Sequence, residues 1–91
     1  MTKDEAIQKL TKKGFIAKEM NSSESIFGGT SVRDINGINI YDGCFIIDFR
    51  DSQYWTIRQL GGQTMEDILH SSLDVAVDYI IEKIPLNFVS C

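Results

Sequence analysis

Residues 35–58, which read INGINIYDGCFIIDFRDSQYWTIR, decide the fold of this chain. Asn36-Gly37 and Asp42-Gly43 are typical of tight hairpin turns, because a type I′ turn needs positive φ at both central positions. A two-residue turn at Asp42-Gly43 would pair Ile40 with Phe45 and keep Ile38, Ile40 and Ile47 on one face. The stretch therefore predicts consecutive antiparallel strands joined by tight turns.

The loop at residues 51–53 sets the expected register of the next strand. A two-residue loop would place Phe49 opposite Tyr54, whereas a three-residue loop pairs Phe49 with Trp55 and continues one apolar face. We favour the three-residue loop for this reason, and we expect Trp55 to be largely buried against a helix. The opposite, open face of the sheet then carries Cys44, Ile46, Asp48, Arg50, Tyr54, Thr56 and Arg58.

Helices are predicted at both ends of the chain. Thr2 and Glu5 form a capping box that begins a helix over residues 3–13. Apolar residues recur at helical spacing over residues 73–84, and Pro85 ends this second helix.

The remaining segments complete the expected order of elements. Residues 15–20 and residues 25–32 each read as one strand, and Gly61-Gly62 is expected to end the sheet. The sequence pattern over residues 65–70 does not decide between a helix and a strand. Residues 86–91 are too apolar for a free end, so we expect this tail to dock on the domain or on a partner.

Length and composition fit one soluble domain over residues 1–91. Hydrophobic residues make up 43% of the chain and charged residues 24%, values ordinary for a globular domain. We therefore predict an α+β fold with two layers, in which an antiparallel sheet of three to four strands packs against an N-terminal and a C-terminal helix.

The net charge of −4 is distributed unevenly along the chain. Residues 1–18 hold five lysines and two carboxylates, and the rest holds four basic side chains and eleven carboxylates, a net of −7. Because phosphate binding depends on Lys and Arg, this composition is unfavourable for nucleic-acid binding and suits a basic protein partner. The start of the sequence lacks the pattern of a secretory signal, and no apolar run could span a membrane, so we expect a cytoplasmic protein.

Few residues offer catalytic or metal chemistry. His70 is the only histidine, and neither it nor Cys44 lies in a nucleophile motif. No spacing of His and Cys suits a metal site, so we expect no metal, no cofactor and no enzymatic activity. Cys44 and Cys91 are expected to be free thiols, as in a reducing compartment.

Two groups of charged and aromatic residues are the candidates for binding a partner. The first is expected on the open sheet face, where Tyr and Arg would act as interface anchors, and comprises Asp48, Arg50, Tyr54 and Arg58. The second follows helical spacing with no lysine four residues away from its last three members, and comprises Asp67, Asp74, Asp78 and Glu82. Like charges at this spacing repel each other. A sequence that tolerates the repulsion could use the electrostatic field of these carboxylates to attract a basic protein.

The order of elements invites comparison with the double-stranded-RNA-binding domain, but residues 70–75 lack the basic character that this family has at its second helix. The acidic composition and the segment 71–81 after a hairpin and a double glycine resemble small immunity proteins of bacterial contact-dependent growth inhibition. The resemblance implies an antitoxin-like protein that covers the active or substrate-binding surface of a basic, nuclease-type toxin domain. The alternatives are a phage-encoded acidic inhibitor that mimics nucleic acid, and a small enzyme that uses His70 and Cys44.

Overall fold

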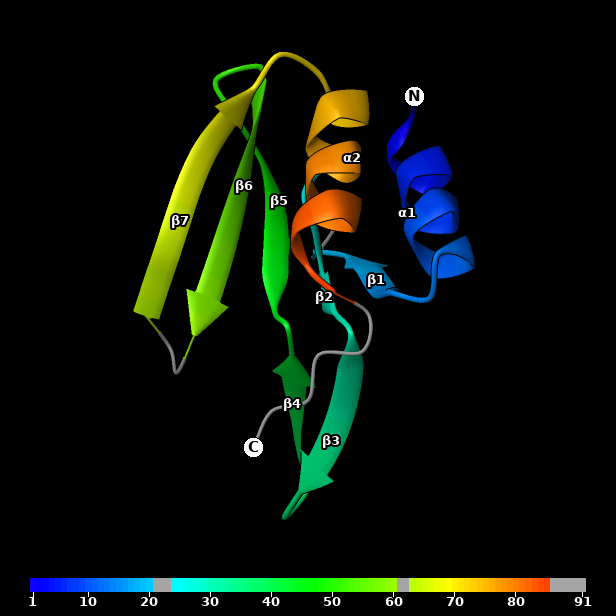
Figure 1. Cartoon of the computed structure of the whole chain (residues 1–91), viewed down its shortest axis with the longest axis vertical. Helices are drawn as coiled ribbons and strands as arrows, with labels where there is room; N and C mark the ends of the chain where they lie inside the picture. The colour runs from blue at the N-terminus through cyan, green and yellow to red at the C-terminus, as the bar shows by residue number, and fades with distance from the viewer. Residues whose placement is uncertain (21–23, 61–62, 86–91) are drawn as a thin grey trace.

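The computed structural model describes residues 1–20, 24–60 and 63–85 and has an α+β fold with two helices (Figure 1). The elements follow in the order α1 (Lys3–Lys12), β1 (Ile16–Glu19), β2 (Ile26–Gly29), β3 (Ser31–Ile35), β4 (Ile38–Asp42), β5 (Phe45–Arg50), β6 (Gln53–Leu60), β7 (Gln63–His70) and α2 (Leu73–Lys83).

The strands form two separate antiparallel sheets. Five of them make the main sheet in the order β1-β2-β5-β6-β7, and β3 pairs only with β4. The described part of the chain holds seven strands, more than the three to four that the sequence predicts. One reason is that residues 25–32, expected as one strand, divide into β2 in the main sheet and β3 in the smaller one.

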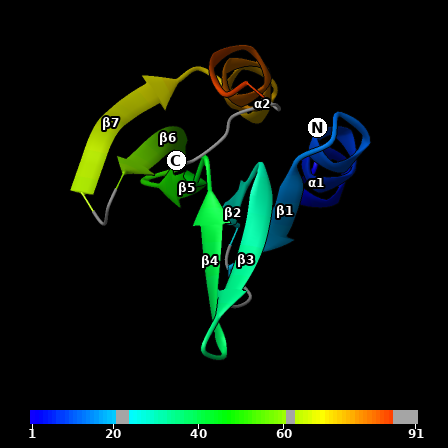
Figure 2. The ribbon, with the colours of Figure 1, turned by 60° about the horizontal axis from the view of Figure 1, so that its bottom comes forward.

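The β3–β4 ribbon projects away from the body of the domain (Figure 2). Its turn is the one predicted at Asn36-Gly37, where both residues have positive φ, 53° and 81°. The ribbon exposes four large apolar side chains, those of Val32, Ile35, Ile38 and Ile40.

The prediction that Asp42-Gly43 forms a hairpin turn is wrong. Ile40 pairs with Arg33 of β3 instead of Phe45, and β5 pairs with β2 and β6. The physical reason lies in the Asp42 carboxylate, which is 9% exposed and accepts two hydrogen bonds from the Arg33 guanidinium, at 3.1 and 2.9 Å. This bidentate pair is consistent with a ribbon that ends at Asp42, after which the chain passes into the main sheet.

The loop between β5 and β6 has two residues, so the predicted three-residue loop is also wrong. Asp51 and Ser52 both have positive φ, 52° and 61°, and Phe49 lies opposite Tyr54. A shift of one residue turns every side chain of β6 to the other face of the sheet. Trp55 is therefore half-buried on the face without helices, and not largely buried against a helix as expected.

The sheet continues beyond the point where the sequence places its end. Residues 65–70 belong to β7, which pairs along β6. The glycines at 61 and 62, and the tail at 86–91 that was expected to dock, lie outside the described residues.

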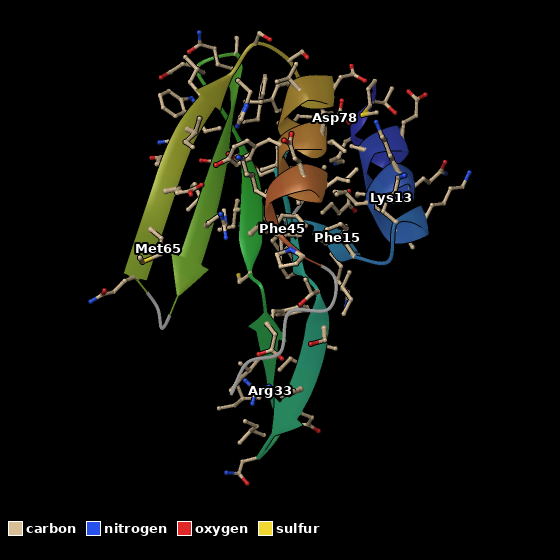
Figure 3. The ribbon with its side chains drawn as sticks, in the orientation of Figure 1. Lys13, Phe15, Arg33, Phe45, Met65 and Asp78 are labelled. Atoms are coloured by element: carbon tan, nitrogen blue, oxygen red, sulfur yellow. The ribbon has the colours of Figure 1, made fainter. Side chains whose placement is uncertain are left out.

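Both helices pack on one face of the main sheet. The capping box of α1 is confirmed, with Glu5 N–H donating to Thr2 Oγ1 and Thr2 N–H donating to Glu5 Oε1, and Ser72 caps α2. Phe15 and Phe45 meet edge to face at 6.0 Å inside the core (Figure 3). The buried apolar side chains are those of Ala6, Leu10, Phe15, Ile26, Phe45, Ile47, Leu73, Ala76, Val77, Ile80 and Ile84.

We predict that Gly28→Ala unfolds or strongly destabilises the domain. A Cβ at this position would collide with the backbone carbonyl oxygen of Ile16 on the neighbouring strand. We expect the free energy of unfolding to fall by about 3 kcal/mol or more, since backbone cannot move aside as a side-chain end can. Gly37→Ala is the control: it meets no atom within 4 Å and has φ +81°, so we expect a loss of only about 1 kcal/mol. Urea denaturation of both variants measures the difference, and equal losses would contradict the close approach of β1 and β2.

Candidate functional site

The face of the main sheet opposite the helices is the candidate site, and we call it the open face. Residues that pair across antiparallel strands share a face, so the register assigns its members. They include Phe27 from β2, Ile46, Asp48 and Arg50 from β5, Trp55 and Ile57 from β6, and Asp67 and Leu69 from β7.

Arg50 occupies the centre of the polar part of the open face. Its guanidinium carbon lies 4.5 Å from the centroid of the Trp55 ring, a cation–π contact. Nη2 donates a hydrogen bond of 2.6 Å to Asp67 Oδ1. Nε lies 3.0 Å from Asp48 Oδ2 but is too poorly aligned to donate a hydrogen bond. Two carboxylates and an aromatic ring therefore hold the guanidinium in one orientation.

Asp48 is itself fixed by a second contact. Ser25 Oγ donates a hydrogen bond of 2.8 Å to Asp48 Oδ1, and Phe49 N–H donates to the same Ser25 oxygen at 3.1 Å. These bonds tie the side chain to β5 and to Ser25, the residue before β2. The group formed by Asp48, Arg50, Trp55 and Asp67 is thus held in place before any partner arrives, and we call it the Arg50 cluster.

Apolar side chains extend the open face on both sides of the Arg50 cluster. Leu69 is 45% exposed, and the ring of Phe27 meets Tyr41 edge to face at 5.6 Å. A shallow groove of about 340 Å³ lies at the same end of the face as Phe27 and is lined by Glu19, Met20, Phe27, Cys44 and Ile46.

Three of the residues predicted for the open face, Tyr54, Thr56 and Arg58, lie on the helix side of the sheet. Tyr54 is half-buried there and packs its ring 5.0 Å from that of Phe49; burial raises the pKa of its hydroxyl. Arg58 Nη1 donates to Glu66 Oε1 at 3.3 Å. Asp48 and Arg50 are on the open face as predicted, whereas the two-residue loop turns Tyr54 and Arg58 away from it and brings Trp55 there.

Glu66 links Arg58 to α2. The hydroxyl of Tyr79 donates to Glu66 Oε2, and this hydrogen bond is the main cause that raises the pKa of Tyr79. The contact joins β7 to the C-terminal helix.

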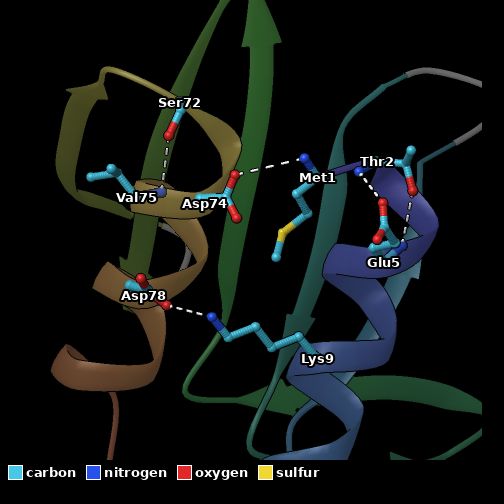
Figure 4. Close-up of polar contacts among 8 residues, drawn as sticks. All are labelled: Met1, Thr2, Glu5, Lys9, Ser72, Asp74, Val75 and Asp78. Carbon is cyan, nitrogen blue, oxygen red and sulfur yellow. Dashed lines mark hydrogen bonds and ion pairs between the residues drawn. The ribbon is translucent and has the colours of Figure 1, made fainter.

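The predicted acidic stripe on the second helix has partners that the sequence does not reveal. Lys9 Nζ of α1 lies 2.8 Å from Asp78 Oδ1, and the amino group of Met1 lies 3.7 Å from Asp74 Oδ2 (Figure 4). The expectation that these carboxylates lack compensation is therefore wrong for Asp74 and Asp78, because the amino group of Met1 and the Lys9 side chain of α1 supply it. Glu82 is exposed, and Asp67 lies on β7 and not on the helix.

The structure does not bring Cys44 and His70 together. Cys44 precedes β5 at the end of the sheet where β5 begins, and His70 ends β7 at the opposite end, on the helix side. Burial raises the pKa of the Cys44 thiol, which lowers its thiolate content at neutral pH. Cys91 lies outside the described residues. His70 Nε2 shares a hydrogen bond of 2.7 Å with Thr56 Oγ1, and its ring packs 4.9 Å from that of Tyr79.

Among residues 1–20, 24–60 and 63–85, no three His, Cys, Asp or Glu side chains are grouped to hold a metal ion. In the same part of the chain, neither helix has the length and apolar character needed to cross a membrane. Comparison of the sequence and structure with protein-family models, curated proteins and solved structures finds no match.

We predict that His70 gives the domain a pH dependence of stability between pH 7.5 and 5.5. Burial lowers the pKa of His70 in the folded state, so the unfolded chain takes up the proton first as the pH falls. The stabilisation is complete above the unfolded pKa of about 6.5 and is lost as the pH falls toward the folded pKa. Because His70 is the only histidine, His70→Gln should flatten the curve of unfolding free energy against pH in this window. Urea titrations across the window measure the slope, and an unchanged slope in the variant would assign it to another group.

The ion pair between Lys9 and Asp78 can be tested by charge exchange. We predict that Lys9→Glu and Asp78→Lys each lower the free energy of unfolding and that the double variant recovers part of the loss. The coupling should be about 0.2–1 kcal/mol, as for an exposed pair, and should decrease at high salt. Additive losses in the double variant would show that α1 and α2 do not use this contact in solution.

Proposed function

We propose that this chain is a non-enzymatic binding protein of the immunity or antitoxin type. Its open face would cover the active or substrate-binding surface of a cognate toxin domain. The observation that carries this proposal is the Arg50 cluster, a guanidinium stacked on Trp55 and held between Asp48 and Asp67 on a sheet face that neither helix covers.

The chemistry of the Arg50 cluster is that of an interface anchor. Trp and Arg are the residues most often found to dominate binding free energies, and they do so in packed centres surrounded by weaker contacts. The contacts of Asp48 and Asp67 fix the Arg50 rotamer in advance, so binding would lose less side-chain entropy. Half-exposed apolar side chains around the cluster, such as Ile46, Ile57 and Leu69, offer the area that a partner could bury.

Charge favours a basic partner. The chain beyond residue 18 has a net charge of −7, which would speed the approach of a positively charged domain. Within the acidic stripe, Asp74 is already paired with the Met1 amino group and Asp78 with Lys9 of α1, so the overall charge and not that stripe would supply the attraction.

The structure offers less support for the two alternatives. A mimic of nucleic acid would present unpaired carboxylates in a row, but both carboxylates of the Arg50 cluster face an arginine. A small enzyme would need a base beside its nucleophile, and Cys44 and His70 lie at opposite ends of the sheet.

A rescue assay tests the proposal. The product of the neighbouring gene is expressed from an inducible promoter until it arrests growth, and this chain is supplied from a second plasmid. We expect the wild-type chain to restore growth, and Trp55→Ala and Arg50→Ala to lose protection through faster dissociation from the purified toxin domain, roughly a hundredfold for a truncated anchor.

The matched control is Lys12→Ala, a cation removed from the exposed surface of α1. Circular dichroism and thermal melting establish that each variant is folded. Full protection by a folded Trp55→Ala variant would show that the open face is not the binding surface. A toxic neighbour that the wild-type chain neither binds nor neutralises would remove the antitoxin proposal itself.

A further inference from the structure

The two edges of the main sheet differ in their protection. β1 forms one edge; it has only four residues, carries the exposed Lys18 and contacts α1. Short length, lysine and a neighbouring helix are the devices by which proteins keep an edge strand from pairing with other chains. This edge is therefore closed to a further strand.

β7 forms the other edge and lacks the first two of these devices; α2 contacts it on the helix side through Tyr79. It has eight residues, about 26 Å at 3.3 Å per residue, and contains neither lysine nor proline. It is the last strand in the order, and no other described strand pairs with its outer side (Figure 1). Three large apolar side chains are exposed along it, Met65 at 60%, Ile68 at 36% and Leu69 at 45%; Figure 3 shows Met65 near the beginning of the strand.

We infer that β7 receives an extended segment of the partner as a sixth, antiparallel or parallel strand, with a lysine or arginine of that segment beside Asp67. Main-chain hydrogen bonds would supply affinity, and side-chain neighbours would supply selectivity. Only the basic character of the partner rests on the proposed function; the open edge is a separate feature.

Asp67 supplies the selectivity for a basic residue. Its Oδ1 accepts from Arg50, whereas no hydrogen bond to Oδ2 is found among the described residues, and the side chain is 41% exposed. Glu66 differs, because Arg58 and Tyr79 occupy one oxygen each. A cation on an added strand would thus lie beside Asp67, with apolar neighbours beside Ile68 or Leu69.

The same charges argue against a second copy of this chain as the occupant. In the full-length antiparallel register of β7 with itself, Glu66 lies opposite Asp67 of the other copy. Shifting the register by one residue in either direction places Glu66 opposite Glu66 or Asp67 opposite Asp67. Like charges directly opposite each other destabilise a strand pair, so the registers with the longest overlap are the unfavourable ones.

The test uses the whole chain and two capped eight-residue peptides of alternating valine and threonine. One peptide carries two lysines in its centre, and the other carries two glutamates at the same positions. We expect the lysine peptide to slow amide hydrogen exchange within residues 63–70 and to bind about tenfold more tightly than the glutamate peptide, since a favourable charge pair replaces a like-charge pair. Asp67→Asn should reduce this preference while retaining an oxygen that can accept from Arg50.

Two proline variants locate the binding edge. Successive amide N–H groups along a strand point to opposite sides of it. Ile68 and Leu69 are adjacent, so the N–H of one points toward β6 and the N–H of the other points toward the open edge. We expect one of Ile68→Pro and Leu69→Pro to unfold the strand, and the other to remain folded but lose slowed exchange with the lysine peptide.

Several results would overturn the inference. Equal binding of both peptides, or slowed exchange at β1 in place of β7, would remove β7 as a selective edge. A dimer that forms with rising concentration and slows exchange of β7 without peptide would identify a second copy as the occupant.

Two further results separate this edge from the open face and from the proposed function. If the Trp55→Ala variant, which retains β7, still binds the lysine peptide, then binding at this edge does not depend on the open face. Growth rescue by the folded proline variant would leave the proposed function standing and remove the role of the edge.

Discussion

The left-handed backbone at Asp51 and Ser52 is the constraint on which the rest of the structure depends. Two residues with φ of 52° and 61° close the turn between β5 and β6 and fix their register. That register places Thr56 in the core and Trp55 beside Arg50. Since β7 pairs along β6, the position of Asp67 follows from the same turn. The cost of positive φ at non-glycine residues is lower for Asp, and the twist of the turn suits the twist of the strands.

Signals that depend on a few neighbouring residues could be read from the sequence. The capping box at Thr2, the turn at Asn36-Gly37 and the helix that begins at Leu73 are all present, because each is decided by contacts within one or two turns of chain. The strand assignments failed where tertiary contacts decide. Asp42-Gly43 has the composition of a hairpin turn, but the Arg33 pair and the bonding of β5 to β2 give it another role.

Two of the four residues first predicted to bind a partner could be placed on the correct face from neighbouring residues alone. Asp48 and Arg50 lie on β5, whose faces are marked clearly by Phe45 and Ile47. β6 carries a large aromatic side chain on each face, Trp55 on one and Tyr54 on the other, so alternation alone could not choose between loops of two and three residues. The cations that meet Asp74 and Asp78 belong to Met1 and to Lys9 of α1, more than sixty residues away in the chain and beyond the reach of any spacing rule.

The β3–β4 ribbon has a consequence for how this architecture can vary. β2 and β5 are adjacent partners in the main sheet, so residues 30–44 are a detour from an otherwise simple hairpin. Lengthening such a connection costs little, about 0.6 kcal/mol for each doubling, because loop entropy grows only with the logarithm of length. The ribbon could therefore grow, shrink or be exchanged for another segment without altering the register of the five strands. The scaffold and its projecting arm are in this sense separable parts, and the arm is where insertions would be tolerated best.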